Sequence, residues 1–369
     1  MLITFNTFSR LEQMSEQNCA IAYVHLGTEL PPTLEEFSKS PRNFQGKIHK
    51  VLITDEERSM LQFDGKVVVH DELSRAGKAL LEERPFYSRV ASGYWLNTYE
   101  RLFALRAIAD LRELTPMPIV HLESDVLPIF NSVDIEFLCN NFKKVAIPRF
   151  SEDRGIGSFM FAPNLGILLD TLDELEELTI KNRDWIENDM ELLGLALNNG
   201  ILAELPSHPS DYEKAAYNLV DNARVLFDGA AFGQYLFGQD PFHQAGMRYS
   251  GYENPSYVLR TKIDSMLWKL ESNQSESTLI VEFENIRYRI ANIHVHSKEI
   301  IPPISAGDVR WQRAIDEANG NIARKREPST VSSPHTNKLG LAVRFQIARK
   351  KGLSRTLFNY VKKRLSWGP

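Results

Sequence analysis

The sequence has few cysteines and no long hydrophobic run. Its 369 residues include two cysteines, Cys19 and Cys139, which stand in no metal-ligand spacing. A disulfide framework and a structural zinc site are therefore not indicated. No stretch approaches the roughly 18 consecutive apolar residues needed to cross a bilayer, and residues 1–10 lack the basic start and long apolar run of a secretion signal. These absences predict a cytoplasmic protein.

Basic residues are unevenly distributed along the chain. The formal net charge is -5, yet residues 321–369 contain twelve Lys or Arg against one acid, Glu327. This end of the sequence carries +11, so residues 1–320 carry -16. An acidic body argues against a nucleic-acid-binding core, and the two parts are expected to have different partners.

Apolar, β-branched runs alternate with helical patterns in the first half of the chain. Strands are expected at residues 20–26, 48–54, 66–69, 119–122 and 144–147, and helices at 34–38, 71–82, 98–114 and 134–141. This alternation predicts an α/β fold with a mostly parallel sheet and helices on both faces. Ligands of such sheets lie beyond the carboxyl ends of the strands. Those ends are Gly27-Thr28, Asp55-Glu56 and Glu123-Ser124-Asp125.

The second half mixes strand and helix patterns and ends in a basic segment. Elements are expected at residues 158–161, 164–178, 184–197, 229–237, 279–283 and 288–296. We expect a domain over 1–300, a linker over 301–338 and a basic amphipathic helix within 339–369. Such a helix suits an anionic membrane surface or a partner protein, and both interpretations stay open.

The strand around His121-Leu-Glu-Ser-Asp125 turns acidic at its carboxyl end. Alternation places His121, Glu123 and Asp125 on one side. Two carboxylates one residue apart can bind Mg²⁺ or Mn²⁺, which then bridges the diphosphate of a nucleotide. Acids are also common at strand ends as simple caps, so the triplet needs support from elsewhere in the chain.

Further polar residues follow downstream. An extended segment over 292–298 would place His294, His296 and Lys298 on one face, where an imidazole could ligate a metal and the lysine could meet phosphate. The alternative is the wet face of a half-exposed strand. Four more candidates are Asp228 and Gln234 near a small-residue helix, Asp189 on another helix, and Arg101 just before the acidic strand. Capping, solvation and surface ion pairing are their ordinary explanations.

Taken in this order, the segments over residues 20–300 resemble glycosyltransferases of the GT-A fold, particularly bacterial proteins thought to build surface polysaccharides. Glu123 to Asp125 look like the Asp-x-Asp metal motif, and residues 292–298 look like the late His that ligates metal. Glu123 replaces the usual first Asp, so Asp125 is the expected direct ligand and action through a water is open for Glu123. His294 and His296 are the other metal-ligand candidates.

The resemblance implies a hexosyltransferase-type reaction from a nucleotide-sugar to a hydroxyl of a glycan or lipid-linked acceptor, with inversion or retention undecided. The implied donor-binding residues are His25, Gly27, Thr54, Arg101, Glu123, Ser124, Gln234 and Lys298. The resemblance does not assign the catalytic base; if the reaction inverts, Asp189 or Asp228 is the candidate that takes the hydroxyl proton. The alternatives are a non-catalytic carbohydrate-binding scaffold and a sugar-phosphate nucleotidyltransferase. The nucleotidyltransferase is disfavoured because Gly27-Thr28 begins no Gly-rich, Arg-containing loop.

Overall fold

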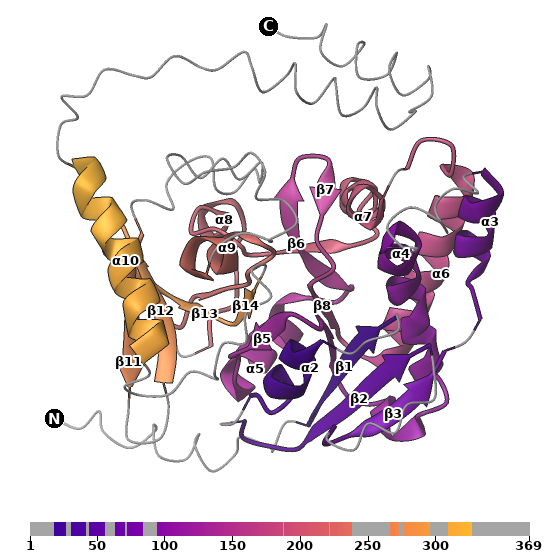
Figure 1. Cartoon of the computed structure of the whole chain (residues 1–369), viewed down its shortest axis with the longest axis horizontal. Helices are drawn as coiled ribbons and strands as arrows, with labels where there is room; N and C mark the ends of the chain where they lie inside the picture. Colours follow the sequence, from indigo (N-terminus) through magenta and orange to yellow (C-terminus); the bar gives the residue numbers. More distant parts are fainter. Residues whose placement is uncertain are drawn as a thin grey trace, which may run out of the picture.

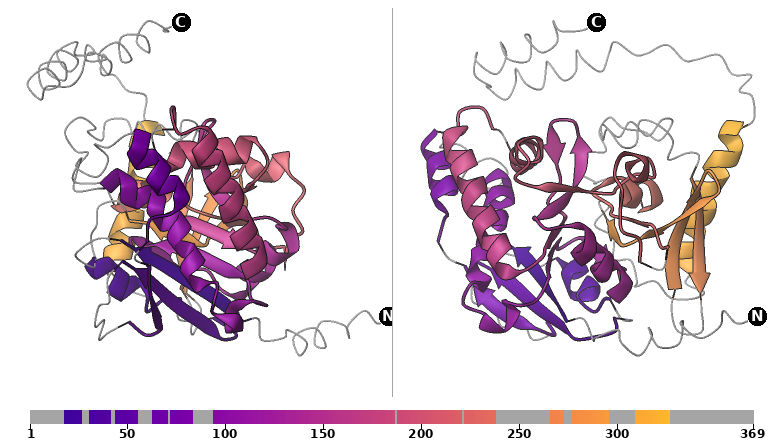
Figure 2. Two further views of the ribbon diagram at one scale, coloured as in Figure 1. Left: turned by 90° about the vertical axis from the view of Figure 1, so that its right-hand side faces the viewer. Right: turned by 180° about the vertical axis from the view of Figure 1, so that it is seen from behind.

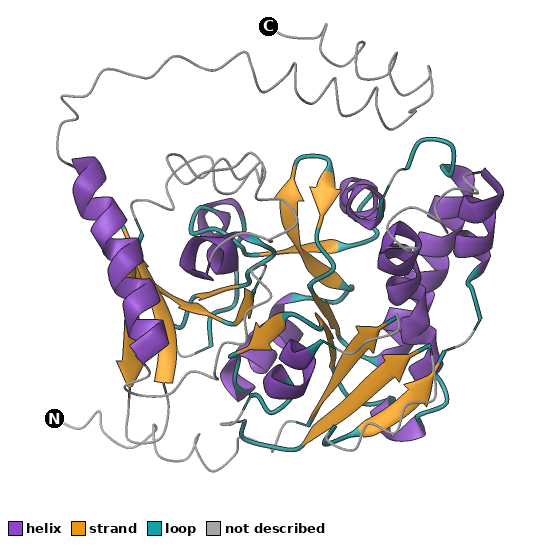
Figure 3. Ribbon diagram, viewed as in Figure 1, coloured by secondary structure: helices purple, strands orange, loops and turns teal. Residues whose placement is uncertain are grey.

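The computed structural model describes eleven stretches of the chain. They are residues 18–26, 31–41, 44–55, 63–70, 72–83, 94–186, 188–220, 222–237, 266–272, 277–295 and 309–326. The predicted basic helix within 339–369 lies outside them, as do Gly27, His296 and Lys298. Helices and strands are mixed throughout the described part (Figure 3). None of the described helices is long and apolar enough to span a membrane.

A large sheet forms the centre of the molecule (Figure 1). Its strands are β1 (Cys19–His25), β2 (Ile48–Thr54), β3 (Lys66–Val69), β4 (Ile119–Glu123), β6 (Ala146–Ser151), β7 (Arg154–Gly155), β8 (Phe159–Ala162) and β9 (Ala203–Leu205). They follow the order β3-β2-β1-β4-β8-β6-β7, with β9 beside β6. The pairs β3-β2, β2-β1, β1-β4 and β6-β9 are parallel, whereas β8 is antiparallel to β4 and β6. The prediction of a mostly parallel α/β sheet is confirmed.

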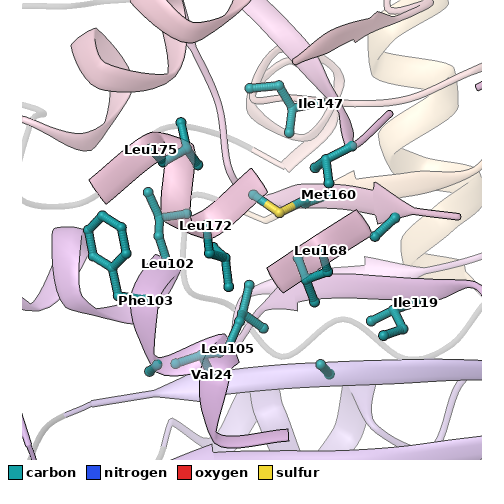
Figure 4. Close-up of a cluster of buried hydrophobic side chains, with 14 of the residues drawn as sticks. Val24, Leu102, Phe103, Leu105, Ile119, Ile147, Met160, Leu168, Leu172 and Leu175 are labelled. Carbon is teal, nitrogen blue, oxygen red and sulfur yellow. The ribbon is translucent and has the colours of Figure 1, made fainter. Parts of the chain in front are cut away.

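Both faces of the sheet are buried under helices (Figures 1 and 2). One face packs against α3 (Arg75–Glu83), α4 (Tyr94–Ala104), α6 (Leu165–Lys181) and α7 (Asp189–Asn198), and the other against α2 (Pro32–Phe37) and α5 (Ser132–Asn141). Strand β1 shows the alternation directly, because Val24 joins the first core and Tyr23 the second. Figure 4 shows part of the first core, in which Leu102 and Phe103 of α4 lie near Leu172 and Leu175 of α6.

Asparagine caps set where two of these helices begin. The Asn188 side chain accepts the Glu191 backbone N–H at 3.0 Å, so α7 begins at Asp189 rather than within residues 184–188, as the pattern had indicated. Asn131 and Asp134 form a capping box at α5. After α4 the chain continues through two 3₁₀ turns, Leu105–Ile108 and Arg112–Leu114. Strand β4, with the acidic turn at its end, follows them.

A second unit lies beside the central sheet. Its sheet has the order β10-β13-β12-β11, formed by β10 (Val225–Leu226), β11 (Leu267–Ser272), β12 (Ser277–Phe283) and β13 (Ile286–Ile290). Helix α8 (Asp211–Lys214) precedes this sheet in the chain, and α9 (Ala231–Phe237) lies between β10 and β11. Helix α10 (Val309–Arg326) runs along β11 (Figure 1). The sequence analysis expected a linker over 301–338. Part of that range is helix α10, because buried Trp311 and Ile315 pack into the core of this unit.

The edge strand β11 is closed by a side chain of α10. The Asn319 amide accepts the Trp268 backbone N–H at 2.9 Å and donates to the Trp268 carbonyl at 2.9 Å, so it stands in for a neighbouring strand. We expect Asn319→Ala to lower the free energy of unfolding by about 1–3 kcal/mol, since two hydrogen bonds are lost. Urea denaturation measures the change. Gln312→Ala, at an exposed position of the same helix, should stay within about 0.5 kcal/mol; equal effects of the two would contradict the role of Asn319.

Candidate metal centre

The acidic turn lies where the buried strand β4 ends. Glu123 is the last residue of β4, and its backbone N–H donates to the Ser158 carbonyl at 3.1 Å. Asp125 follows in the turn to the short strand β5 (Val126–Pro128). Glu123 and Asp125 are only 8% and 6% exposed, while Ser124 between them is half-buried. Two carboxylates therefore lie in a largely dry environment, where an uncompensated charge is costly.

A strand from the far end of the described chain brings a histidine to these acids. Strand β14 (Asn292–His294) pairs antiparallel with β5, with His294 opposite Val126, and the Val295 N–H donates to the Asp125 carbonyl at 2.8 Å. As a result, Nε2 of His294 lies 3.4 Å from Oδ1 of Asp125 and 3.7 Å from Oε2 of Glu123. His294 is 6% exposed.

The other ring nitrogen of His294 fixes its tautomer. Nδ1 lies 2.7 Å from the Gly229 carbonyl oxygen, which can only accept a hydrogen bond. The neutral ring therefore carries its proton on Nδ1 and presents the Nε2 lone pair to the two acids. A histidine whose second nitrogen donates to a carbonyl is the usual arrangement of a metal ligand.

The three side chains fit a single cation. Glu123, Asp125 and His294 each offer one ligand atom, and these atoms all lie within 4.8 Å of one another. Metal–ligand bonds of about 2.0–2.2 Å place neighbouring ligand atoms about 3.0–3.5 Å apart, close to the spacings around Nε2 of His294. Two carboxylates with one imidazole suit a divalent ion. Among the described residues, this is the group that could hold one.

An arginine joins the acidic turn to helix α7. Nη2 of Arg101, on α4, lies 2.9 Å from Oε1 of Glu123 and 2.9 Å from Oδ2 of Asp189. Burial alone lowers the pKa of Arg101, but the nearby Glu123, Asp189 and Asp125 outweigh it and hold that pKa above its usual value. Burial raises the pKa of Glu123. Glu123 and Asp189 therefore share the guanidinium of Arg101, and Asp125 lies near enough to it to act on its charge.

Asp228 lies behind His294 and is almost fully buried, at 1% exposure. Its carboxylate accepts three backbone N–H groups: those of Phe232 at 2.9 Å, Gly233 at 2.8 Å and His294 at 2.9 Å. Burial raises the pKa of Asp228, against the lowering effect of these hydrogen bonds. Asn292 adds two hydrogen bonds to the Asp228 backbone, at 3.0 and 2.8 Å. The residue thus ties β14 to the start of α9.

The other candidate residues that the structure describes lie on strands β1, β2 and β4 and on helix α9. His25 and Thr54 are opposite each other at the carboxyl ends of β1 and β2. Gln234 is half-buried on α9. His121 packs inside the sheet, with Nδ1 3.0 Å from the Ala22 carbonyl, and burial lowers its pKa to about 3.

The sequence reasoning missed the residues that support the centre. Gly229 accepts hydrogen bonds from both His294 and the Ser158 hydroxyl, the latter at 2.9 Å. Gly233 leaves room for the His294 backbone, because an added Cβ would lie 2.6 Å from the His294 carbonyl carbon. The small-residue run 229–233 was a visible signal of close packing, but it did not show what packs there.

Parts of three solved glycosyltransferases are similar to this chain. Mouse xyloside xylosyltransferase 1 is 11% identical, with 54% of this chain and 91% of that chain covered and a TM-score of 0.34. GlyE of Streptococcus pneumoniae is 13% identical, with 53% of this chain and 48% of that chain covered and a TM-score of 0.33. An active-site mutant of LgtC is 12% identical, with 54% of this chain and 78% of that chain covered and a TM-score of 0.35. No protein-family model matches the sequence, and no curated protein matches it. These low identities and TM-scores leave function to be inferred from the side chains of the site.

Proposed function

We propose that the chain is a divalent-metal-dependent glycosyltransferase that moves a sugar, as a hexosyltransferase would, from a nucleotide-diphosphate-sugar to a hydroxyl of a glycan or lipid-linked acceptor. One observation supports this most: Glu123, Asp125 and His294 converge from distant parts of the chain, and each offers one ligand atom around a single point. A divalent cation held there would supply positive charge to the diphosphate of a donor.

The bound ion, Mn²⁺ or Mg²⁺, supplies positive charge that stabilises the leaving diphosphate. The two carboxylate oxygens of Glu123 have different neighbours: Oε1 pairs with Arg101, and Oε2 faces Nε2 of His294. Arg101 holds Glu123 and Asp189 at fixed positions, so that both acids border the place of the donor. This use of Nη2 favours a positioning role for Arg101 over a direct contact with phosphate.

Other donor-binding roles remain proposals of the same kind. His25 and Thr54 end neighbouring parallel strands at the edge where ligands of α/β sheets bind, which suits the donor nucleotide. Ser124 and Gln234, both half-buried, would contact the donor from the turn and from α9. For Gly27, Lys298 and the second candidate ligand His296, which lie outside the described residues, the proposal rests on the sequence.

Two acids were candidate bases, and we assign them different roles. Asp189 lies beside Glu123 through their shared partner Arg101, so it borders the donor and stays the candidate base of an inverting reaction. Asp228 uses both oxygens for backbone N–H groups and is buried behind His294. We assign it to positioning that histidine.

Asp228→Asn separates these roles. Oδ1 of Asp228 accepts the Phe232 N–H, whereas Oδ2 accepts those of Gly233 and His294. An amide has only one acceptor oxygen, so one of these two sets loses its partner and the support of His294 is disturbed. Changes to groups that orient a metal ligand typically weaken metal binding by about 10–100-fold, and we expect a loss of that size. Calorimetric titration with MnCl₂ alone measures it, with circular dichroism to verify folding. Unchanged Mn²⁺ affinity with lost turnover would instead identify Asp228 as a base.

A screen of nucleotide-sugars tests the function as a whole. We expect at least one of the UDP-, GDP- and CDP-sugars to be hydrolysed slowly when MnCl₂ or MgCl₂ is present and not after EDTA treatment. The same donor should raise the melting temperature, because a ligand that binds only the folded state stabilises it. If no donor is hydrolysed or stabilises the protein, the carbohydrate-binding scaffold becomes the better explanation. Accumulation of sugar-phosphate with pyrophosphate would point to a nucleotidyltransferase.

For location, we propose a cytoplasmic protein whose basic segment 339–369 contacts the inner face of the membrane. The evidence is the charge pattern of the sequence, with basic residues surrounding Leu353, Leu357 and Leu365. Flotation with vesicles containing phosphatidylserine, for the full chain and for a chain ending at residue 329, tests this. Equal flotation of both would refute the membrane role of the segment.

A further inference from the structure

A cavity with several charged side chains in its wall lies at the same edge of the sheet as the metal centre, between β6 and α8. Its volume is about 540 Å³, and Arg149, Glu204, Asn198 and Tyr217 contribute to its wall. Strands β4 and β6 are both antiparallel to β8 and so point in the same direction. Their carboxyl ends therefore share one edge, and the cavity lies beyond the end of β6 as the metal centre lies beyond the end of β4.

Helix α7 links the two places. It begins at Asp189, which pairs with Arg101 in the metal centre, and ends at Asn198, which lines the cavity. With a rise of 1.5 Å per residue, the two ends of this helix are about 14 Å apart. The cavity is thus separate from the transfer centre but near enough for one extended molecule to reach both.

The cavity wall is organised before any ligand binds. Arg149 is held by Nε to Oε2 of Glu204 at 2.6 Å and by Nη1 to the Glu152 carbonyl at 2.9 Å and Oδ1 of Asn198 at 3.1 Å. Within the part of the chain that the structure describes, Nη2 of Arg149 and the Tyr217 hydroxyl have no hydrogen-bond partner. Both residues line the cavity, and side chains that are already held in place lose little entropy when a ligand binds.

The charges and group types indicate the class of ligand. Two cations, Arg149 and Lys214, face three carboxylates, those of Glu152, Glu204 and Asp211. A slight excess of negative charge opposes phosphates and other anions, and a purely apolar lipid chain would bury the charged side chains of the wall without partners. Donors and acceptors around an amphipathic tyrosine ring suit a neutral molecule that carries many hydroxyl groups.

We propose that this cavity binds a sugar unit of the acceptor glycan, remote from the unit that receives the transferred sugar. This inference rests on the proposed function. A chain held at both places gains affinity because the second contact is intramolecular. Longer acceptors are then preferred over short ones, and the enzyme acts on the end of an existing glycan.

The test uses the full chain with maltohexaose, cellohexaose and chitohexaose as probes. Saturation-transfer NMR measures the binding of each. Ala215→Trp fills the cavity from an exposed position of its wall, and Ala109→Trp makes the same change at an exposed alanine outside the lining. At least one hexasaccharide should bind the wild type, and Ala215→Trp should weaken binding at least about tenfold because the indole occupies the space of a sugar unit. Ala109→Trp should bind as the wild type does, and Asp125→Ala should retain binding, because the cavity itself is unchanged. Tyr217→Phe, which keeps the ring, should weaken binding less than Ala215→Trp.

The proposal is overturned if no hexasaccharide binds, if Ala215→Trp binds as well as the wild type, or if Asp125→Ala abolishes binding, since the glycan would then sit at the metal centre. The metal-dependent donor assay is separate. Hexasaccharide binding without donor hydrolysis would leave a carbohydrate-binding cavity and refute the glycosyltransferase. Hydrolysis without hexasaccharide binding would refute the cavity alone.

Discussion

Asp125→Ala is expected to remove Mn²⁺ binding and to lower donor turnover by at least about 10³-fold. Asp125 supplies the oxygen nearest to Nε2 of His294, at 3.4 Å, so its loss leaves Glu123 and His294 as two ligands at most. A bound divalent ion contributes several kcal/mol to the stabilisation of a leaving diphosphate, and each 1.36 kcal/mol is about tenfold in rate. Calorimetric titration with MnCl₂ and steady-state hydrolysis of the donor measure the two effects.

A graded series makes this result specific. Asp125→Asn keeps the shape and one oxygen but removes one negative charge, so its Mn²⁺ affinity should lie between that of the wild type and that of Asp125→Ala. Asp170→Ala removes an exposed acid of α6 and should change neither measurement. Turnover of Asp125→Ala within tenfold of the wild type would contradict the proposed metal dependence.

Gly233→Ala is expected to displace strand β14 and with it His294. The added Cβ would lie 2.6 Å from the His294 carbonyl carbon and closer still to its oxygen, and these are backbone atoms that cannot rotate away. Overpacking of this kind typically costs about 1–3 kcal/mol and sometimes more. We expect a lower melting temperature together with Mn²⁺ affinity reduced at least about tenfold, in line with losses on disturbing a ligand's support.

The matched control is Gly320→Ala in α10, where an added Cβ meets nothing within 4 Å. Alanine is favoured over glycine inside helices by up to about 1 kcal/mol, so this variant should be slightly more stable than the wild type. Opposite signs for the same substitution would identify the backbone contact at Gly233 as the cause. Normal stability and normal Mn²⁺ binding in Gly233→Ala would show that β14 can move aside without loss.

Periodicity was enough to predict the sheet, because strands buried on both faces and amphipathic helices leave local patterns. The prediction of a mostly parallel α/β sheet is confirmed. The start of α7 was misplaced by a few residues, since the decisive signal is the hydrogen bond of a single cap, Asn188. Helix α10 lay in an expected linker, where polar residues outweighed the few apolar positions of its buried face.

The candidate site was predictable in its residue types but not in its pairings. Glu123, Asp125 and His294 were named from strand ends and alternation, yet nothing local indicated that β5 and β14, three residues each, would pair. The partner of Arg101 was also hidden. A guanidinium before an acidic strand suits a diphosphate as well as a carboxylate, and only the placement of α7 brings Asp189 to it.

The pairing of β5 with β14 has a consequence for how the chain matures. Residues 125 and 294 are 169 positions apart, so their contact is among the latest to be completed as the polypeptide leaves the ribosome. A nascent chain that ends before β14 has both carboxylates but lacks His294 and the strand that pairs with β5. A cation would then bind tightly only to the completed chain. Its binding energy would stabilise the contact between the two units after both have folded.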